Sequence, residues 1–210
     1  MIIGLLNQKG GVGKTTLSVN LAGAFVEQGY NVLLVDADPQ GSSLSWSAVR
    51  ESASLFPVVK MDKPTLHKDL PKLAASYDIT IIDGAPRVNE LARSAIMASD
   101  LIVIPVQPSP VDVWATDDIV ALIKDASVYR ENLKTVFAVN RKISNTAIGR
   151  DVHHAFADQE YPVLPETICQ RVIFAESFTQ GLTVLETDPN CIAAEEIRKL
   201  ASALINSAQE

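Results

Sequence analysis

The sequence contains few cysteines, few aromatic residues and no long hydrophobic run. Its two cysteines, Cys169 and Cys191, cannot form a disulfide framework and are typical of a protein in a reducing compartment. No segment reaches the ~18–20 consecutive apolar residues that a membrane-spanning helix needs, and the first residues lack the basic segment of a signal peptide. We therefore expect a cytoplasmic protein with no stable membrane association.

An excess of positive charge is also missing. The chain has 18 lysines and arginines against 25 aspartates and glutamates, a net charge of -7. Bulk charge therefore excludes a general polyanion-binding protein, and any contact with DNA requires a local basic patch. With 47% apolar and 20% charged residues the composition is that of a folded protein. The length favours a single domain over residues 1–210.

Short apolar runs alternate with segments of helical periodicity. Between the first two runs, Leu17, Leu21 and Phe25 recur at four-residue spacing and predict a helix that ends near Gly29. We predict an α/β fold, an open, mostly parallel twisted sheet flanked by helices on both faces. The proline-rich segment Pro105–Pro110 is expected to be a loop that closes a strand, because proline cannot continue a central ladder. The apolar runs expected to form buried strands are Ile2–Leu6, Val32–Val35, Ile79–Ile82, Leu101–Val106 and Val136–Val139.

A glycine-rich segment follows the first strand and opens the first helix, which is the context that a phosphate-binding loop requires. The glycines allow backbone amides to turn toward phosphate oxygens, and the helix N-terminus adds partial positive charge. Lys14 is expected to reach the β- and γ-phosphates, the Thr15 hydroxyl to bind magnesium, and Thr16 to contact the α-phosphate. A glycine-rich turn with an incidental lysine is the alternative. The expected nucleotide-binding residues of the loop are Gly10, Gly11, Val12, Gly13, Lys14, Thr15 and Thr16.

A second lysine, Lys9, stands at the entrance of this loop, and Gln8 occupies the position that is glycine in the common pattern. The form Lys-Gly-Gly-x-Gly-Lys-Thr resembles the deviant Walker A box of the ParA/MinD superfamily of ATPases, most closely the small ParF-like partition proteins. The resemblance implies an ATP-dependent homodimer in which Lys9 contacts the partner's nucleotide, as a trans-acting cation would. A solvated loop lysine is the alternative.

Two further strands end in carboxylates. The segment Val35–Gln40 matches the family's Asp-x-Asp-Pro-Gln pattern; by resemblance Asp38 orients the attacking water and Asp36 lies near the magnesium. Without the resemblance the same segment is compatible with a turn rich in aspartate. Asp83, which ends the apolar run Ile79–Ile82, has the position of a Walker B residue and is expected to hold magnesium through a water molecule. Here Asp-Gly-Ala-Pro replaces the more usual Asp-x-Pro-Pro.

The base is expected to be adenine. In related ATPases an asparagine at the position of Asn140 hydrogen-bonds the adenine edge, and the chain has no Asn-Lys-x-Asp motif for guanine. The resemblance thus implies ATP and Mg2+ as cofactors, with Lys9, Lys14 and Asp38 as the catalytic residues and a slow basal turnover.

The family resemblance implies a partition ATPase that segregates plasmid or chromosomal DNA. Its dimer would bind non-specific DNA on the nucleoid, and a ParB-like centromere-binding or cargo-adaptor protein would stimulate hydrolysis. Basic residues near Asn140 are candidates for DNA contact, although they also fit a solvated surface, and the first of them could serve the nucleotide site instead. These residues are Arg141, Lys142, Arg150 and Arg171.

Three other functions use the same scaffold. A MinD-like membrane ATPase needs a basic amphipathic C-terminal helix, and the last segment here is not rich in basic residues. A reductase with an iron–sulfur cluster needs cysteines near the aspartate segments, and both cysteines lie far downstream; a synthetase that activates a small substrate with ATP stays open. A ParA-like protein that positions a protein cargo differs only in its partner, so the sequence does not separate it from DNA segregation.

Overall fold

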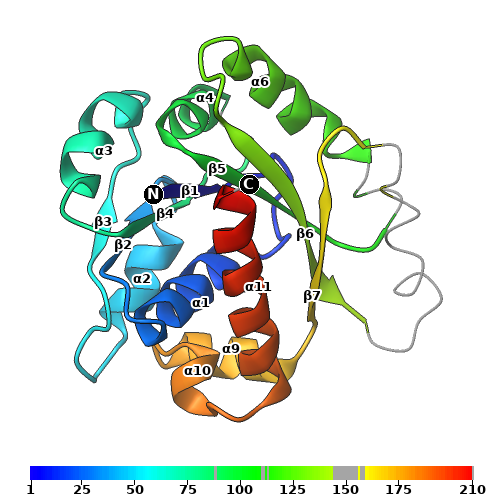
Figure 1. Ribbon diagram of the computed structural model, residues 1–210. Coiled ribbons are helices and arrows are strands. Elements are labelled where there is room, and N and C mark those ends of the chain that lie inside the picture. The colour runs from blue at the N-terminus through cyan, green and yellow to red at the C-terminus, as the bar shows by residue number, and fades with distance from the viewer. Residues whose placement is uncertain (88, 110–111, 113, 144–155, 157–158, 210) are drawn as a thin grey trace.

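The computed structural model describes residues 1–87, 89–109, 112, 114–143, 156 and 159–209. Strands and helices alternate along most of the chain (Figure 1). The strands are β1 (Ile2–Leu5), β2 (Val32–Asp36), β3 (Val58–Lys60), β4 (Ile79–Asp83), β5 (Leu101–Val106), β6 (Lys134–Lys142) and β7 (Val163–Cys169). The helices are α1 (Lys14–Glu27), α2 (Ser42–Ala48), α3 (Leu66–Ala74), α4 (Asn89–Ala98), α6 (Asp117–Ser127), α9 (Val172–Thr179), α10 (Val184–Thr187) and α11 (Ile192–Gln209).

The seven strands in the described part of the chain form one parallel sheet in the order β3-β2-β4-β1-β5-β6-β7. Strand β1 is central, and the chain adds strands first on its β4 side and later on its β5 side. Ligands of open α/β sheets bind beyond the carboxyl ends of the strands where the order reverses. The glycine-rich loop follows β1, and the carboxylates of Asp36 and Asp83 end β2 and β4, which pair Asp36 with Asp83 in register.

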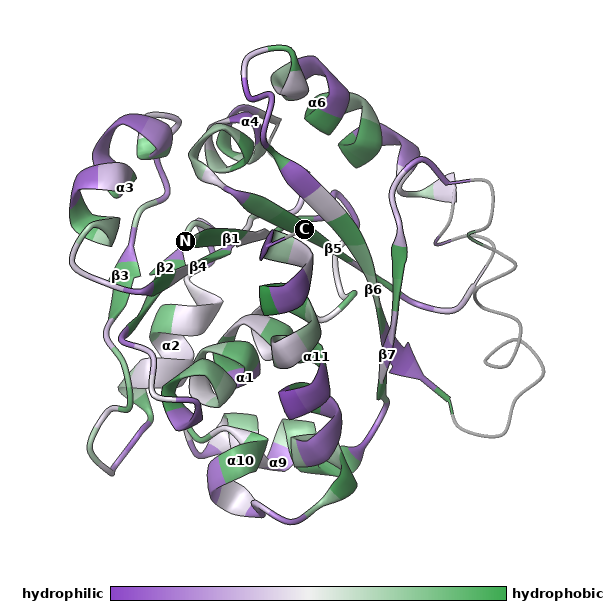
Figure 2. Cartoon of the chain, in the orientation of Figure 1, coloured by the Kyte–Doolittle hydropathy of each residue, from purple (hydrophilic) through white to green (hydrophobic). Residues whose placement is uncertain are grey.

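Helices cover both faces of the sheet (Figure 1). Helices α1, α2, α10 and α11 bury their apolar residues on one face, and α3, α4 and α6 on the other. The central strands are hydrophobic along their length, because side chains on both faces are covered (Figure 2). The predicted fold class is therefore confirmed.

The five predicted strands all form, and the first predicted helix is α1. Leu17, Leu21 and Phe25 are buried along its inner face, and Gly29, just beyond its end, adopts a φ of 91°. Glycine favours this left-handed conformation at the end of a helix, because it has no Cβ to be strained there.

The expectation that Pro105 lies in a loop is wrong. Pro105 is within β5 and pairs with Ala138 of β6. The backbone N–H of Leu6 donates to the carbonyl of Val103, so Val103, and two residues later Pro105, face the β1 side. Strand β1 has already ended there, so no ladder donor is required of Pro105, and its carbonyl accepts a hydrogen bond from Asn7 Nδ2 at 2.9 Å.

The two edges of the sheet are short or irregular. Strand β3 has three residues, and β7 pairs with β6 through a shifting register. In β7, Pro165 has no backbone N–H, and the N–H of Cys169 donates to Glu196 of α11 at 3.0 Å. Both features leave few donors on this edge.

No helix in the described part of the chain has the length and apolar character needed to cross a membrane.

Candidate functional site

The glycine-rich loop is held open at its tip. Gly11 and Gly13 adopt positive φ angles of 76° and 91°, and Gly13 is the N-cap residue of α1. A Cβ atom at Gly10 or Gly11 would meet nothing within 4 Å, whereas Val12 is fully buried and anchors the loop. The loop thus presents its backbone to solvent directly above a helix N-terminus, the geometry of an anion-binding loop.

Lys14 lies along the inside of the loop. Its Nζ donates to the carbonyls of Asn7 and Lys9, both at 3.0 Å, and only 7% of the residue is exposed. Burial lowers the pKa of Lys14, although the nearby carboxylates of Asp83 and Asp38 act in the opposite direction. Negatively charged phosphate oxygens would therefore stabilise this buried ammonium group more than its two carbonyl partners do.

Asn7 is a site residue that sequence reasoning missed. Its Oδ1 accepts the backbone N–H of Lys9 at 2.9 Å, its carbonyl accepts Lys14, and its Nδ2 holds Pro105. The side chain fixes the turn between β1 and the loop. An asparagine directly after a buried strand was the available signal, since it favours such local side-chain-to-backbone bonds.

Lys9 does not line the cavity beside its loop. Its Nζ forms an ion pair with Asp112 Oδ1 at 3.0 Å. About one third of the Lys9 side chain is exposed, whereas that of Asp112 is almost completely buried. The chain therefore keeps this lysine at the rim of the site.

Asp83 and Asp36 form a buried carboxylate cluster with hydroxyl groups. Ser43 Oγ donates to Asp83 at 2.8 Å and Ser18 Oγ at 3.3 Å. Desolvation raises the pKa of Asp83 to about 6, although the hydroxyls of Ser43 and Thr15 lower it. The pKa of Asp36 is also raised, first by burial. Ser43 was not anticipated, because nothing in the sequence ties the start of α2 to β4.

Asp38 lines the cavity beside the loop. The preceding carboxylate positions it, because Asp36 Oδ1 accepts the Asp38 backbone N–H at 3.1 Å and Asp36 Oδ2 accepts the N–H of Leu44 at 2.9 Å. Asp38 Oδ1 accepts the N–H of Gln40, which begins the turn into α2. The predicted water-orienting carboxylate thus stands on a segment that its neighbours hold firmly.

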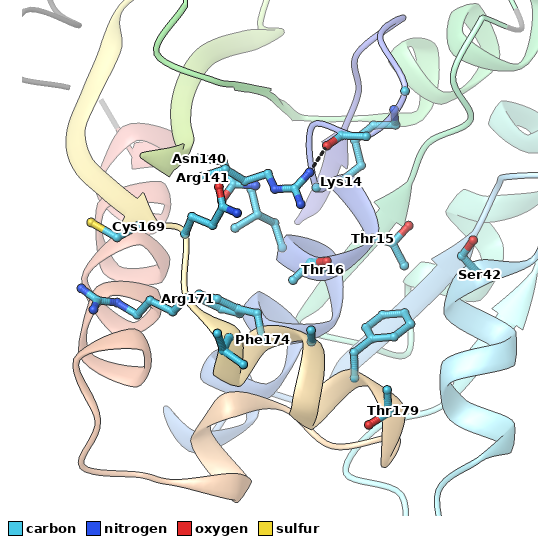
Figure 3. Close-up of a pocket in the computed structure, with 18 of the residues that line it drawn as sticks. Lys14, Thr15, Thr16, Ser42, Asn140, Arg141, Cys169, Arg171, Phe174 and Thr179 are labelled. Atoms are coloured by element: carbon cyan, nitrogen blue, oxygen red, sulfur yellow. Dashed lines mark hydrogen bonds between the residues drawn. The ribbon is translucent and has the colours of Figure 1, made fainter. Parts of the chain in front are cut away.

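The loop forms one end of a cavity of about 1150 Å3 (Figure 3). One wall consists of the phosphate loop, Asp38 and Ser42, and the opposite wall is apolar and comes mainly from α9, with Phe174 and Phe178. A polar end and an apolar end suit a nucleotide, whose phosphates and base differ in the same way.

The residues also fit magnesium. Among the described residues no group of three or more histidines, cysteines, aspartates or glutamates forms a metal cluster. Asp36, Asp83 and the Thr15 hydroxyl supply only oxygen ligands, and Mg2+ prefers oxygen and retains several of its water molecules. These three residues also lie together, because Asp36 pairs in register with Asp83 and the Thr15 hydroxyl hydrogen-bonds to Asp83.

Asn140 and Arg141 close over the loop from the end of β6. Asn140 Nδ2 donates to the carbonyl of Val12 at 2.8 Å, and a Cβ at Gly13 would overlap this amide nitrogen. Arg141, with an unusual φ of 55°, donates from Nη1 to the carbonyl of Gly11 at 2.6 Å (Figure 3). The structure thus associates Arg141 with the nucleotide pocket, the alternative to DNA contact that the sequence left open.

The other basic candidates for DNA contact are Lys142, Arg150 and Arg171. Lys142 is half-buried at the end of β6, and Arg150 lies outside the described residues. Arg171 lines the cavity, and its guanidinium pairs with Glu196 of α11, with Nη2 and Oε1 2.7 Å apart (Figure 3). That hydrogen bond raises the pKa of Arg171. DNA contact by these residues stays a prediction.

Comparisons with known proteins show relatives that align with almost the whole chain. The chain is 29% identical over 209 residues to maintenance of carboxysome distribution protein A of Halothiobacillus neapolitanus, covering 98% of this chain and 96% of that protein. It is 27% identical to sporulation initiation inhibitor protein Soj of Bacillus subtilis, covering 95% and 96%. Its fold matches cobyrinic acid a,c-diamide synthase of Mycobacterium smegmatis with bound ADP and magnesium, with a TM-score of 0.80, 24% identity and coverage of 100% and 95%.

A family model also covers most of the chain, from residue 3 to residue 184. Some structures of similar fold contain ADP or an ATP analogue together with magnesium. The chain belongs to the CobQ/CobB/MinD/ParA nucleotide-binding domain family, within the ParA/MinD superfamily of ATPases.

Proposed function

We propose that this chain is a slow ATPase that dimerises over bound ATP and positions a cargo over DNA. The observation that carries the proposal is the placement of Lys9. This lysine belongs to the phosphate loop, yet its amine stands outside its own cavity and is partly exposed. A cation at this position can reach the phosphates of a second subunit placed against the cavity mouth, where it would stabilise negative charge.

The chemistry of hydrolysis follows from the residues already placed. ATP binding supplies the phosphates, and magnesium supplies the charge that neutralises them. Lys14 exchanges its two carbonyl partners for phosphate oxygens. Asp38 accepts a hydrogen bond from the attacking water and so orients it. Asn140 faces the loop from the base side and selects adenine.

For the cargo we favour a protein assembly. The relative from Halothiobacillus neapolitanus is named for the distribution of carboxysomes, and the alignment covers almost the whole of both chains. Segregation of plasmid or chromosomal DNA is the second candidate, which the Soj relative supports. In both cases a ParB-like or adaptor protein bound to the cargo would stimulate hydrolysis, and the ATP dimer would bind non-specific DNA through residues such as Lys142 and Arg150.

The charge arrangement of α11 disfavours a membrane-positioning role. Its two basic residues are both in ion pairs, Lys199 with Glu195 and Arg198 with Glu27. A helix whose basic groups are already neutralised gains little from an anionic lipid surface. We therefore place the protein in the cytoplasm, on the nucleoid.

The dimer can be tested by light scattering with ATP and with ADP. We expect Asp38→Ala to form a stable ATP dimer without turnover, and Lys9→Ala to stay monomeric while it still binds ATP. Lys63→Ala, which removes an exposed lysine that neither belongs to the loop nor lines the cavity, is the matched control and should dimerise normally. A Lys9→Ala protein that dimerises with ATP would contradict the proposal.

The cargo requires a separate experiment in the source organism. Deletion of the gene should leave DNA inheritance intact and cause a protein assembly to cluster. Loss of plasmid or chromosome inheritance, with all protein assemblies evenly placed, would instead support the second candidate. The ATP-bound Asp38→Ala protein should also bind DNA of any sequence, with an affinity that falls steeply as salt rises.

A further inference from the structure

Helix α2 is attached at its beginning to both buried carboxylates of the magnesium site. Ser43 Oγ donates to Asp83 at 2.8 Å, and the backbone N–H of Leu44 donates to Asp36 at 2.9 Å. The preceding residue, Ser42, lines the cavity. Any displacement of α2 along its axis therefore changes the surroundings of the carboxylates expected to hold magnesium.

The other end of α2 is attached to the turn that follows α9. Trp46 Nε1 donates to the carbonyl of Leu182 at 3.2 Å. Arg50, two residues beyond the helix, donates from Nη1 to the carbonyl of Gly181 at 2.9 Å and forms a two-pronged ion pair with Glu186. The Arg50 side chain is 5% exposed, so this attachment is buried.

The turn itself has little freedom to move independently. Gly181 has a φ of 66°, and a Cβ at this position would lie 2.7 Å from the backbone nitrogen of Arg50. Glu186 also accepts the N–H of Thr183 at 3.0 Å within a capping box. Burial raises the pKa of Glu186, but hydrogen bonds from Arg50 and Thr183 outweigh it and lower the pKa below its ordinary value. The pair is therefore ionic.

Helix α9, which ends just before this turn, forms the apolar wall of the cavity with Phe174 and Phe178 (Figure 3). A continuous chain of contacts thus runs from the base side of the cavity, through the turn at Gly181 and along α2, to Asp36 and Asp83. We propose that Arg50 is a positioning residue that couples occupation of the base side to magnesium binding. The proposal rests on nucleotide and magnesium binding in this cavity and not on the nature of the cargo.

The coupling has a measurable thermodynamic form. If a base against α9 holds the carboxylates in place, Mg2+ should strengthen the binding of ADP by a larger factor than it strengthens the binding of pyrophosphate, which has no base. We call the ratio of the ADP factor to the pyrophosphate factor the excess. This excess isolates the contribution of the base to magnesium binding. Couplings between sites typically amount to about 5- to 150-fold. We expect Arg50 variants to lose most of this excess, by about fivefold or more.

The variants must keep the protein folded. Replacing Arg50 alone by alanine would leave Glu186 buried without its partner, which is strongly destabilising. We therefore choose the double variant Arg50→Met, Glu186→Gln, which leaves no unpaired charge, and Arg50→Lys, which keeps the charge but not the two-pronged geometry. Urea unfolding of both proteins confirms that they fold.

The test is isothermal titration of ADP and of pyrophosphate, each with and without Mg2+. Support requires that the double variant binds Mg2+-free ADP within about twofold of the original protein and loses the excess, with Arg50→Lys intermediate. An unchanged excess overturns the proposal. The proposal is also overturned if the variant binds ADP and pyrophosphate more weakly by the same factor with and without Mg2+. A residue that only supports the structure of the site would have this effect. If the unsubstituted protein bound neither ADP nor Mg2+, the nucleotide site itself would be wrong.

A fluorescence signal provides an independent readout. The chain has two tryptophans, and Trp114 is 70% exposed whereas Trp46 is buried in the contact with Leu182. In a Trp114→Phe background the emission therefore reports Trp46. Mg2+-free ADP should shift this emission, and the shift should disappear in the Arg50→Met, Glu186→Gln variant. A shift of the same size in both proteins would contradict the coupling.

Discussion

The amine of Lys9 lies 3.0 Å from Oδ1 of Asp112, a residue that is 5% exposed. An ammonium group held by a buried carboxylate must break this pair before it can contact the nucleotide of another subunit. The strength of the pair therefore opposes dimerisation in the proposed mechanism. Because Lys9 is itself partly exposed, its ion pair with Asp112 opposes dimerisation only modestly.

Asp112→Asn should make dimerisation easier. The amide keeps the size of the carboxylate but removes its charge, so Lys9 leaves at a lower cost. We expect the ATP concentration that gives half-maximal dimer to fall by about three- to tenfold, as a partly buried pair worth about 1 kcal/mol implies. Light scattering across an ATP titration measures this concentration. Lys9→Ala combined with Asp112→Asn should not dimerise; a normal dimer from that double variant would show that Lys9 is dispensable.

Lys14→Ala should abolish nucleotide binding. The ammonium group is pre-positioned by two backbone carbonyls, and charged hydrogen bonds to phosphate are among the strongest that a side chain makes. We expect the affinity for ATP to fall by at least about 100-fold, corresponding to about 3 kcal/mol. Calorimetry measures this change, with Lys68→Ala, an exposed lysine on α3, as control. Retained micromolar affinity would refute the role of Lys14.

The pKa of Asp83 predicts a dependence of stability on pH. Because the folded-state pKa is about 6 and the ordinary value is 3.8, the folded protein holds this proton more tightly than the unfolded chain. The stabilising contribution is complete below pH ~4 and is lost as pH rises through ~6, by up to about 3 kcal/mol. Above that pH the protein without metal carries a destabilising buried charge.

Asp83→Asn removes this charge. In EDTA at pH 8 we expect its free energy of unfolding to exceed that of the original protein, with the difference shrinking toward pH 4. Added Mg2+ and ADP should stabilise the original protein much more than the variant. Urea denaturation at the two pH values measures both effects. A variant that is less stable at pH 8 without metal would show that the hydroxyls around Asp83 compensate fully for burial.

Gly13→Ala should destabilise the protein through a steric clash as well as through the positive φ of Gly13. The added Cβ would overlap Asn140 Nδ2, so the two residues are energetically coupled. We expect a loss of about 2–4 kcal/mol in unfolding free energy, with roughly half recovered in an Asn140→Ala background. Urea unfolding of the four proteins completes the cycle. Equal costs of Gly13→Ala in both backgrounds would mean that only the backbone conformation matters.

The sequence predicted the central strands and the position of the glycine-rich loop between the first strand and the first helix, because both depend on local patterns. A strand buried on both faces is a continuous apolar run wherever it pairs, as Leu101–Val106 illustrates. The edge strands β3 and β7 escaped prediction, since partial exposure mixes polar residues into them, such as Glu166 and Thr167 in β7. The rule that proline cannot continue a central ladder also misplaced Pro105. Only the length of the neighbouring strand β1 shows that the missing N–H of Pro105 is not needed.

The site was predictable to the extent that single motifs carry it. Asp36, Asp83, Thr15 and Lys14 each follow from a strand end or the loop. The interactions that connect the motifs were not predictable, because they join residues distant in sequence, as the 40-residue separation of Ser43 and Asp83 shows. Likewise, the residues that the sequence grouped into one basic patch form separate contacts, with Arg141 over the loop and Arg171 bound to Glu196.

The outer edge of β7 has a consequence for self-assembly. A neighbouring molecule that tried to extend the sheet there would meet a proline and an amide already engaged by Glu196. Copies of this protein are therefore not expected to associate by extending the sheet along β7.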